Sequence, residues 1–320
     1  MVSSGRKLHI IVTCTERKTA KVPERLHLRD VPHAKPWERA RDWVERLAGE
    51  VTTPALPAND LYAGEHWTRA KALSSLVLET SAQLWACSAG YGLIPAEAFV
   101  RPYAATLSPG HADSVPDGST GAVAWWEAIA SWEGPKPGQP RTFRELAKSD
   151  SEAIFLLVLS ATYLKACRAD IEAAGAITGS DRFMIVSAGT RDSDPVGAWL
   201  LPASARLQTP LGGTRQVLNV RIAEELLKGQ LTSRAAATDH LQSLLKRYAH
   251  MERYDREKFS GDADVIDWIR EEHKHGRGAS ASRMLRLLRD SGRACEQKRF
   301  GRLHKQFLDE QHREHTGNQP

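Results

Sequence analysis

The sequence predicts an α/β protein: a three-layer sandwich around a mostly parallel central sheet, followed by a smaller helical region. Three observations lead to this fold class. Four short apolar runs lie in the first two-thirds of the chain, and amphipathic helical patterns separate them. Beyond about residue 230 only helical patterns remain.

The four apolar runs are the predicted strands. Each is nearly continuous in apolar character and does not alternate with polar residues. This pattern is typical of strands that are covered on both faces, as in a parallel sheet. The runs are residues 8–14 ("LHIIVTC"), 84–88 ("LWACS"), 153–160 ("AIFLLVLS") and 182–188 ("RFMIVSA").

Helical patterns alternate with these strands along the chain. They lie at residues 37–49, 65–82, 122–132 and 162–175, and a turn with an amphipathic helix follows at 207–227. Because strands and helices alternate, we expect helices on both faces of the sheet.

The domain boundary is expected near residue 230, within "KGQLTSRAAA". The predicted division is an α/β domain at residues 1–230 and a helical region at residues 231–320. Helices of the second part are expected at 232–254, 262–274, 280–289 and 294–314.

Composition excludes several classes of protein. The 320 residues, 41% hydrophobic and 26% charged, are typical of a globular protein with a full core. No apolar run reaches the roughly 18 residues of a membrane span, and the N-terminus predicts a strand and not a signal peptide. The four cysteines form no C-x-x-C pair, which argues against a zinc site or a disulfide scaffold. We therefore expect a cytoplasmic protein without a metal, a cofactor or a membrane partner.

Positive charge is concentrated near the C-terminus. The net charge of the chain is +5, but residues 277–305 hold nine Lys and Arg against two acids. Residues 280–308 predict a helix–turn–helix whose second helix exposes long cations to a DNA groove or phosphate backbone. A solvated basic face is the alternative. The candidate DNA-binding residues here are Arg293, Lys298, Arg299, Arg302 and Lys305.

All four predicted strands end in small or polar residues. In open parallel sheets the ligand crevice lies at the carboxyl ends of the strands. We therefore expect a ligand pocket at this edge, with plain connecting turns as the alternative. The candidate base-binding residues at the strand ends are Cys14, Thr15, Ser88, Gly90, Ser187 and Gly189.

Three tyrosines, Tyr62, Tyr91 and Tyr103, are expected at the same edge. Aromatic rings stack on flat bases, so these side chains are further candidates for base binding. Half-buried packing is the alternative for each. A glycine is expected at position 90 because backbone and base approach closely there, and a side chain would occupy that space.

Charged residues follow the first strand directly. Glu16 is the only carboxylate in that segment and the first candidate for a catalytic carboxylate, ahead of Asp192 and Glu65. Arg17 and Lys18 stand next to it and are expected to attract a phosphate group.

Four short motifs resemble a family of α/β domains. This family is similar to the YaaA-type peroxide-stress proteins and to a domain of archaeal tRNA-guanine transglycosylase relatives. Its fold is related to that of uracil-DNA glycosylases. The resemblance covers about residues 8–110. The motifs are C-x-x-x-K (Cys14, Lys18), L-Y-x-G (Leu61, Tyr62, Gly64), S-A-x-Y-G-L (88–93) and P-Y (Pro102, Tyr103).

The resemblance implies a uracil-DNA-glycosylase-like fold and suggests a phage-defence DNA glycosylase that excises bulky modified bases. Such an enzyme flips a base out of duplex DNA. It then hydrolyses the N-glycosidic bond through an oxocarbenium-like sugar beside a carboxylate.

The chain departs from typical uracil-DNA glycosylases. It lacks their G-Q-D-P-Y and H-P-S-P loops, and its D-P pair, Asp194 and Pro195, follows the last predicted strand. The catalytic carboxylate therefore stays open among the three candidates. Two other functions also stay open: a non-enzymatic DNA-binding protein that senses a nucleotide, and a transferase that modifies nucleobases.

Overall fold

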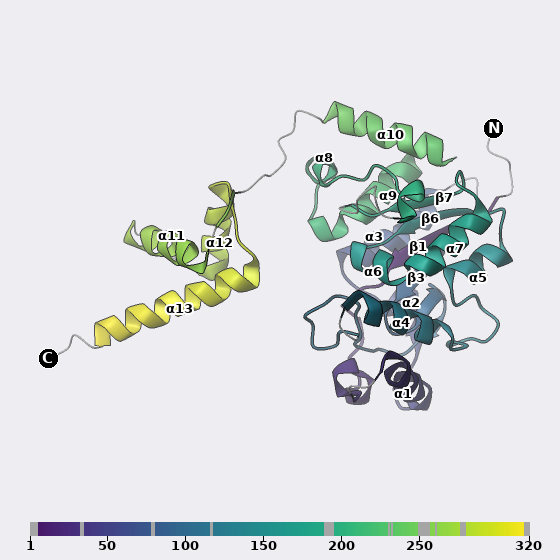
Figure 1. Cartoon of the computed structure of the whole chain (residues 1–320), viewed down its shortest axis with the longest axis horizontal. Coiled ribbons are helices and arrows are strands. Elements are labelled where there is room, and N and C mark those ends of the chain that lie inside the picture. Colours follow the sequence, from purple (N-terminus) through teal and green to yellow (C-terminus); the bar gives the residue numbers. More distant parts are fainter. Residues whose placement is uncertain are drawn as a thin grey trace. The chain divides into compact units, whose positions relative to one another are not determined.

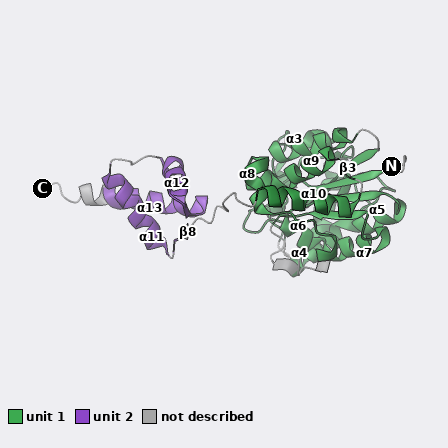
Figure 2. Cartoon of the chain, turned by 90° about the horizontal axis from the view of Figure 1, so that it is seen from above, with its two compact units in different colours: residues 1–251 green, residues 252–320 purple. Residues whose placement is uncertain are grey.

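The computed structural model of the whole chain is shown in Figure 1. It forms two compact units, Met1–Met251 and Glu252–Pro320, each described here by itself (Figure 2). No helix in the described ranges combines the length and the apolar character that a membrane crossing requires. The structure describes residues 6–32, 35–77, 81–115, 118–188, 195–229, 231, 233–248, 257–259, 261–275 and 280–316.

A five-stranded sheet with the order β4-β3-β1-β6-β7 forms the centre of the first unit. The four predicted runs supply its parallel strands: β1 (Leu8–Thr13), β3 (Ala82–Ser88), β6 (Ile154–Val158) and β7 (Phe183–Val186). Most of their side chains are buried, as continuous apolar runs predict. The predicted α/β class with a mostly parallel sheet is confirmed.

Helices lie on both faces of this sheet (Figure 2). On one face α3 (Glu65–Leu73) packs against α9 (Leu218–Lys228). On the other lie α4 (Gly118–Ala130), α6 (Ala161–Ala166) and α7 (Arg168–Thr178). Crossovers between parallel strands are right-handed, and those from β1 to β3 and from β6 to β7 run toward opposite edges. Their helices therefore cover opposite faces, which is compatible with a three-layer sandwich.

The fifth strand, β4 (Gly92–Pro95), is antiparallel to β3 and is absent from the sequence prediction. β3 and β4 form a hairpin whose turn is residues 89–91. Arg141 holds the hairpin from a later loop, because its guanidinium group donates to the carbonyl oxygens of Tyr91 and Leu93. The chain after β3 therefore turns back into the sheet instead of forming an open loop at the pocket edge.

The direction of strand addition reverses at β1. From β1 the chain passes to β3 on one side of it, and it later reaches β6 on the other side. In open α/β sheets the ligand crevice lies outside the carboxyl ends of the strands at such a point. The strands end here at Thr13 and Val158.

The last helix of the first unit, α10 (Arg234–Arg247), buries Ala237, Leu241 and Leu244 in the large core. The units accordingly divide between Met251 and Glu252, whereas the sequence prediction divides the chain at residue 230. The other elements are α1 (Pro36–Gly49), β2 (Leu56–Pro57), α2 (Ala58–Leu61), β5 (Phe99–Val100), α5 (Phe143–Ser149) and α8 (Gln208–Leu211).

The second unit has a core of its own. It consists of α11 (Asp262–Lys274), α12 (Ala281–Asp290) and α13 (Gln297–Thr316), and a short parallel ladder joins β8 (Glu257–Lys258) to β9 (Arg293–Ala294). The three helices lie close to their predicted positions. Their core side chains include Val265, Ile269, Met284, Leu285, Leu288, Phe300, Leu303 and Phe307.

Candidate functional site

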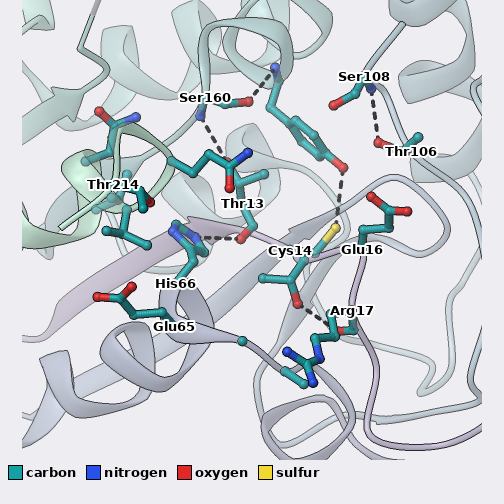
Figure 3. Close-up of a pocket in the computed structure, with 18 of the residues that line it drawn as sticks. Thr13, Cys14, Glu16, Arg17, Glu65, His66, Thr106, Ser108, Ser160 and Thr214 are labelled. Atoms are coloured by element: carbon teal, nitrogen blue, oxygen red, sulfur yellow. Dashed lines mark hydrogen bonds between the residues drawn. The ribbon is translucent and has the colours of Figure 1, made fainter. Parts of the chain in front are cut away.

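A cavity of about 560 Å³ opens at the carboxyl ends of β1 and β6. This is the point where the direction of strand addition reverses, and it is the sheet edge at which the sequence predicts a ligand pocket. Figure 3 shows the side chains around it. The lining comes from parts of five segments: residues 13–17, 63–66, 105–108, 158–163 and 214–219.

Thr13, the last residue of β1, joins three of these segments. Its hydroxyl oxygen accepts the backbone N–H of Ser160 at 3.0 Å, and its carbonyl oxygen lies 3.1 Å from Nε2 of His66. A carbonyl oxygen only accepts, so Nε2 carries the proton and Nδ1 is the acceptor nitrogen of this ring. Burial lowers the pKa of His66. The cavity wall therefore contains a neutral imidazole in one defined tautomer (Figure 3).

Glu16, the first catalytic candidate, lines the cavity. Its Oε1 lies 2.7 Å from Nε2 of His111, and its side chain is 72% exposed. The carboxylate thus meets both an imidazole and water, the setting that a general base requires. The sequence gives no signal for His111, because a single histidine in the loop "LSPGHADS" matches no motif.

Glu65, another catalytic candidate, also lines the cavity, but two arginines bind its carboxylate. Oε1 accepts hydrogen bonds from Arg221 at 2.8 Å and from Arg69 at 3.1 Å. Arg221 and, next, Arg69 lower the pKa of Glu65. A carboxylate held ionised by two guanidinium groups is a poor proton acceptor, so Glu16 is the better candidate.

Of the remaining candidates after β7, only Ser187 lies among the described residues. Ser187 is buried and is absent from the cavity lining. Asp192 and Gly189 lie outside the described residues.

Three predicted residues beside Glu16 do line the cavity: Cys14, Thr15 and Arg17. The thiol of Cys14 lies 3.4 Å from the hydroxyl of Tyr163, and the hydroxyl of Thr15 donates to the carbonyl oxygen of Arg17. The guanidinium group of Arg17 has no ion pair or hydrogen bond in the part of the chain that the structure describes. Among the described residues Arg17 is therefore a cation without a partner at the cavity, as the predicted phosphate contact requires.

Lys18 has a different place from the one expected. Its Nζ donates to the carbonyl oxygens of Thr15 and Glu16, at 2.8 and 3.0 Å, and lies 4.5 Å from the ring centre of Tyr103. Burial lowers the pKa of Lys18. The expected phosphate contact of Lys18 is therefore wrong for this structure, because the ammonium group satisfies backbone oxygens of the β1 exit.

The expectation that three tyrosines stack on a base is also corrected. Tyr62, Tyr91 and Tyr103 are at most 2% exposed and are absent from the cavity lining. The hydroxyl of Tyr103 lies 2.7 Å from that of Ser88 and 2.9 Å from that of Tyr62. Burial raises the pKa of all three tyrosines. These rings have no free face for a ligand, because they fill the core beneath the β3–β4 hairpin.

Ser88 and Gly90 belong to the same core. The hydroxyl oxygen of Ser88 accepts the backbone N–H groups of Gly90 and Tyr91 and so stabilises the hairpin turn. A Cβ atom on Gly90 would lie 2.4 Å from a ring carbon of Tyr103. The space that a side chain would need is therefore occupied by Tyr103 and not by a ligand.

Several residues of the four short motifs meet in this network: Cys14, Lys18, Tyr62, Ser88 and Tyr103. The hydroxyl of Tyr103 links to Ser88, to Tyr62 and, at 3.8 Å, to the thiol of Cys14, while Lys18 lies over the ring of Tyr103. Cys14 belongs to both the network and the cavity lining. These motif residues therefore pack against the segment that follows β1 and support it.

Sequence reasoning misses several polar residues of the lining. Asn219 bridges two strand ends, since its amide oxygen accepts the N–H of Ala188 and its amide nitrogen donates to the carbonyl oxygen of Leu159. Ser160 has a recognisable signal, a serine directly before a helix. The others come from distant loops without a local pattern: Thr106, Ser108, Thr214 and Gln216.

In the second unit, two of the predicted DNA-binding residues form ion pairs with a carboxylate of the same unit. Arg299 and Arg302 each lie 2.6 Å from a different carboxylate oxygen of Asp262, at the start of α11. Arg302 and Arg299 lower the pKa of Asp262. These two arginines therefore connect α13 to α11.

The other three candidates of this unit are exposed. The guanidinium group of Arg293 lies 5.2 Å over the ring of Phe259. Lys298 and Lys305 form no salt bridge with a described side chain.

Comparisons of the chain with family models, with curated proteins and with solved structures give no match. Within the described ranges, no three His, Cys, Asp or Glu side chains come together as a metal site.

Proposed function

We propose that this protein is a DNA glycosylase that takes an extruded, modified base into the cavity and hydrolyses its N-glycosidic bond. The observation that carries the proposal is Glu16, which lines a cavity at the carboxyl ends of β1 and β6 and contacts His111. A base inside a duplex hides its glycosidic bond, so an enzyme of this class needs a pocket for the extruded nucleotide.

The volume of the cavity supports a base with a bulky substituent. Cavities of about 300–1,000 Å³ hold whole small-molecule ligands, and this one measures about 560 Å³. An unmodified pyrimidine ring fills only part of such a space. Hydroxyl and amide groups of the lining, from Ser108 and Gln216 among others, suit a substituent that itself carries hydroxyl groups.

The reaction needs a water molecule, a proton acceptor and stabilisation of positive charge on the sugar. The bond between C1′ and the base nitrogen breaks, and the base leaves with the electron pair of that bond and takes up a proton from solvent. Water oxygen bonds to C1′, and Glu16 accepts the proton that this water loses. The negative charge of Glu16 also favours an oxocarbenium-like sugar, by the logic of glycoside hydrolysis. His111 orients the carboxylate, and Arg17 attracts a flanking phosphate.

A uracil-DNA-glycosylase-like topology is part of this proposal. The mostly parallel sheet with helices on both faces supports it, together with the motif resemblance. DNA is favoured over a free nucleotide as the substrate because nine cations and two acids lie in residues 277–305. The suggested biological setting is defence against phages whose DNA carries modified bases.

The test is base release by the purified full-length protein. Duplexes with unmodified, 5-hydroxymethylated or glycosylated pyrimidines are incubated with the protein, and abasic sites are detected by alkaline strand cleavage. We expect abasic sites in a duplex with a bulky base and few or none in unmodified DNA. Binding without base release from any duplex would contradict the proposal and favour a nucleotide-sensing protein.

A further inference from the structure

The solvent side of α12 carries a stripe of arginines. Arg283, Arg286 and Arg289 recur every three residues, so they lie on one side of the helix with about 5–6 Å between neighbouring Cβ atoms. The opposite side is buried in the core of the second unit through Met284, Leu285 and Leu288. Arg283 and Arg286 are exposed, and Arg289 is half-buried. We call these three residues the α12 stripe.

Among the described residues, the α12 stripe has no counter-charge. None of its three guanidinium groups has an ion pair or a hydrogen bond to any described residue. The first acid of the helix is Asp290, its last residue. Three cations on one helix face with no described counter-charge repel one another, and this cost is typical of a surface that meets a polyanion.

The neighbouring helices differ in this respect. The first turn of α11 contains Asp262 and Asp264, and Asp262 binds Arg299 and Arg302 of α13. The second helix of the predicted helix–turn–helix therefore has part of its charge neutralised within the unit. No described residue neutralises the arginines of α12 in this way.

We propose that the α12 stripe is a contact surface for the phosphate backbone of duplex DNA. Guanidinium groups match phosphate oxygens in geometry and can bind them with two hydrogen bonds. The contact is sequence-independent, because phosphates carry no base information. The choice of duplex DNA over another polyanion rests on the proposed function.

An anionic membrane is the other polyanion to consider. Helices that bind at a membrane interface insert an apolar face between the lipids. The apolar face of α12 is already used, since Met284, Leu285 and Leu288 are at most 4% exposed. The stripe therefore offers charge without an insertable face, which favours a nucleic-acid backbone.

The experiment compares two double variants of the full chain that each remove two positive charges. R283Q/R286Q removes the exposed part of the α12 stripe, and R299Q/R302Q removes the pair that Asp262 binds. Glutamine keeps a high helix propensity, and circular dichroism checks that both variants are folded. Affinity for an unmodified duplex is measured by fluorescence anisotropy at several salt concentrations.

Each phosphate contact contributes about 0.9 to the slope of log affinity against log salt. We expect R283Q/R286Q to reduce that slope by about 2, and R299Q/R302Q to reduce it by less than half as much. Equal effects of the two variants, or an unchanged slope for R283Q/R286Q, would overturn the proposal. The proposal would also be overturned if the wild type bound phosphatidylserine vesicles more tightly than DNA through these arginines.

Binding to an unmodified duplex involves no base release, so this test is separate from that of the proposed function. Stripe-dependent binding without abasic sites in any DNA would contradict the glycosylase and leave the contact surface in place. Base release together with stripe-independent binding would contradict the contact surface and leave the glycosylase in place.

Discussion

Gly90 shows how a residue chosen by packing can resemble one chosen by a ligand. The sequence predicts that a base lies against this glycine, but in the structure the ring of Tyr103 occupies the space. A Cβ atom would stand 2.4 Å from that ring, and Tyr103 is completely buried, with Trp43 and Tyr91 around it. The ring cannot move aside without disturbing the core.

We therefore expect Gly90→Ala to lower the free energy of unfolding by about 1–3 kcal/mol, the usual cost of overpacking a core. The rate of base release per folded molecule should stay close to that of the wild type. Chemical denaturation and a single-turnover assay on the same preparation measure the two quantities. A variant as stable as the wild type but inactive would restore the ligand-contact interpretation.

Arg141 is the second residue that determines the form of the hairpin. Its guanidinium group donates to the carbonyl oxygens of Tyr91, Leu93 and Trp132. Burial lowers the pKa of Arg141 to about 10. The charge is kept in the core because backbone oxygens of the turn accept its hydrogen bonds.

Arg141→Gln leaves buried carbonyl oxygens without donors, and an unsatisfied buried acceptor costs about 1–3 kcal/mol. Arg144→Gln is the matched control, since this arginine is exposed and exposed substitutions usually change stability by less than about 0.5 kcal/mol. Urea titrations of both variants make the comparison. Equal stability of the two would show that Arg141 does not support the hairpin.

At the scale of elements, β1 contains a buried histidine that couples its stability to pH. Nδ1 of His9 accepts the indole N–H of Trp85 at 3.0 Å, so Nε2 carries the proton and donates to Asp150 at 3.1 Å. Burial lowers the pKa of His9 below its ordinary value of 6.5, Asp150 opposes that shift, and Lys7 adds to it.

A folded-state pKa below the unfolded value means that protonation favours the unfolded chain. The stabilising contribution of neutral His9 is complete above pH 6.5 and is lost as the pH falls through the folded pKa. We expect the free energy of unfolding to decrease as the pH falls below about 6.5, the ordinary pKa of histidine, and to decrease less steeply in His9→Gln. His66, whose pKa burial also lowers, contributes with the same sign in both proteins. Identical pH profiles would exclude His9 as a source.

The sequence predicts the strands well because parallel strands are buried on both faces. β1 and β6 therefore appear as continuous apolar runs. The sequence prediction misses β4, because this strand has only four residues, ends in a proline and follows a hairpin turn. The helix predicted at 65–82 ends at Leu73, because the hydroxyls of Ser74 and Ser75 donate to backbone carbonyls and compete with further helical bonds.

The location of the cavity can be predicted from the sequence for a similar reason. Most of the residues that line the cavity cannot. The rule that ligands bind at the carboxyl ends of parallel strands needs only the strands, and it finds Cys14, Glu16 and Arg17. The contact of Glu16 with His111 joins loops far apart in the sequence. The burial of the tyrosines depends on the unpredicted hairpin, so sequence alone does not separate core packing from base stacking.

At the scale of the whole molecule, the two units have separate cores, and the described cavity belongs entirely to the first. A chain of residues 1–251 should therefore fold and release bases with a kcat within about twofold of the full chain, while KM rises, because uniform binding is lost. Steady-state kinetics on one duplex at two salt concentrations measure both constants. A folded but inactive truncation would mean that the second unit takes part in the chemistry.

Glu16 is the proposed proton acceptor of an N-glycosidic hydrolysis in the β1–β6 cavity. The most direct measurement is the single-turnover rate of base release by Glu16→Gln, with Glu24→Gln as a matched control at an exposed glutamate of the same unit. We expect a loss of about 10²- to 10⁴-fold for Glu16→Gln, the range typical of a general base, with DNA affinity and melting temperature unchanged. Glu24→Gln should react at the wild-type rate. Wild-type base release by Glu16→Gln would contradict the account.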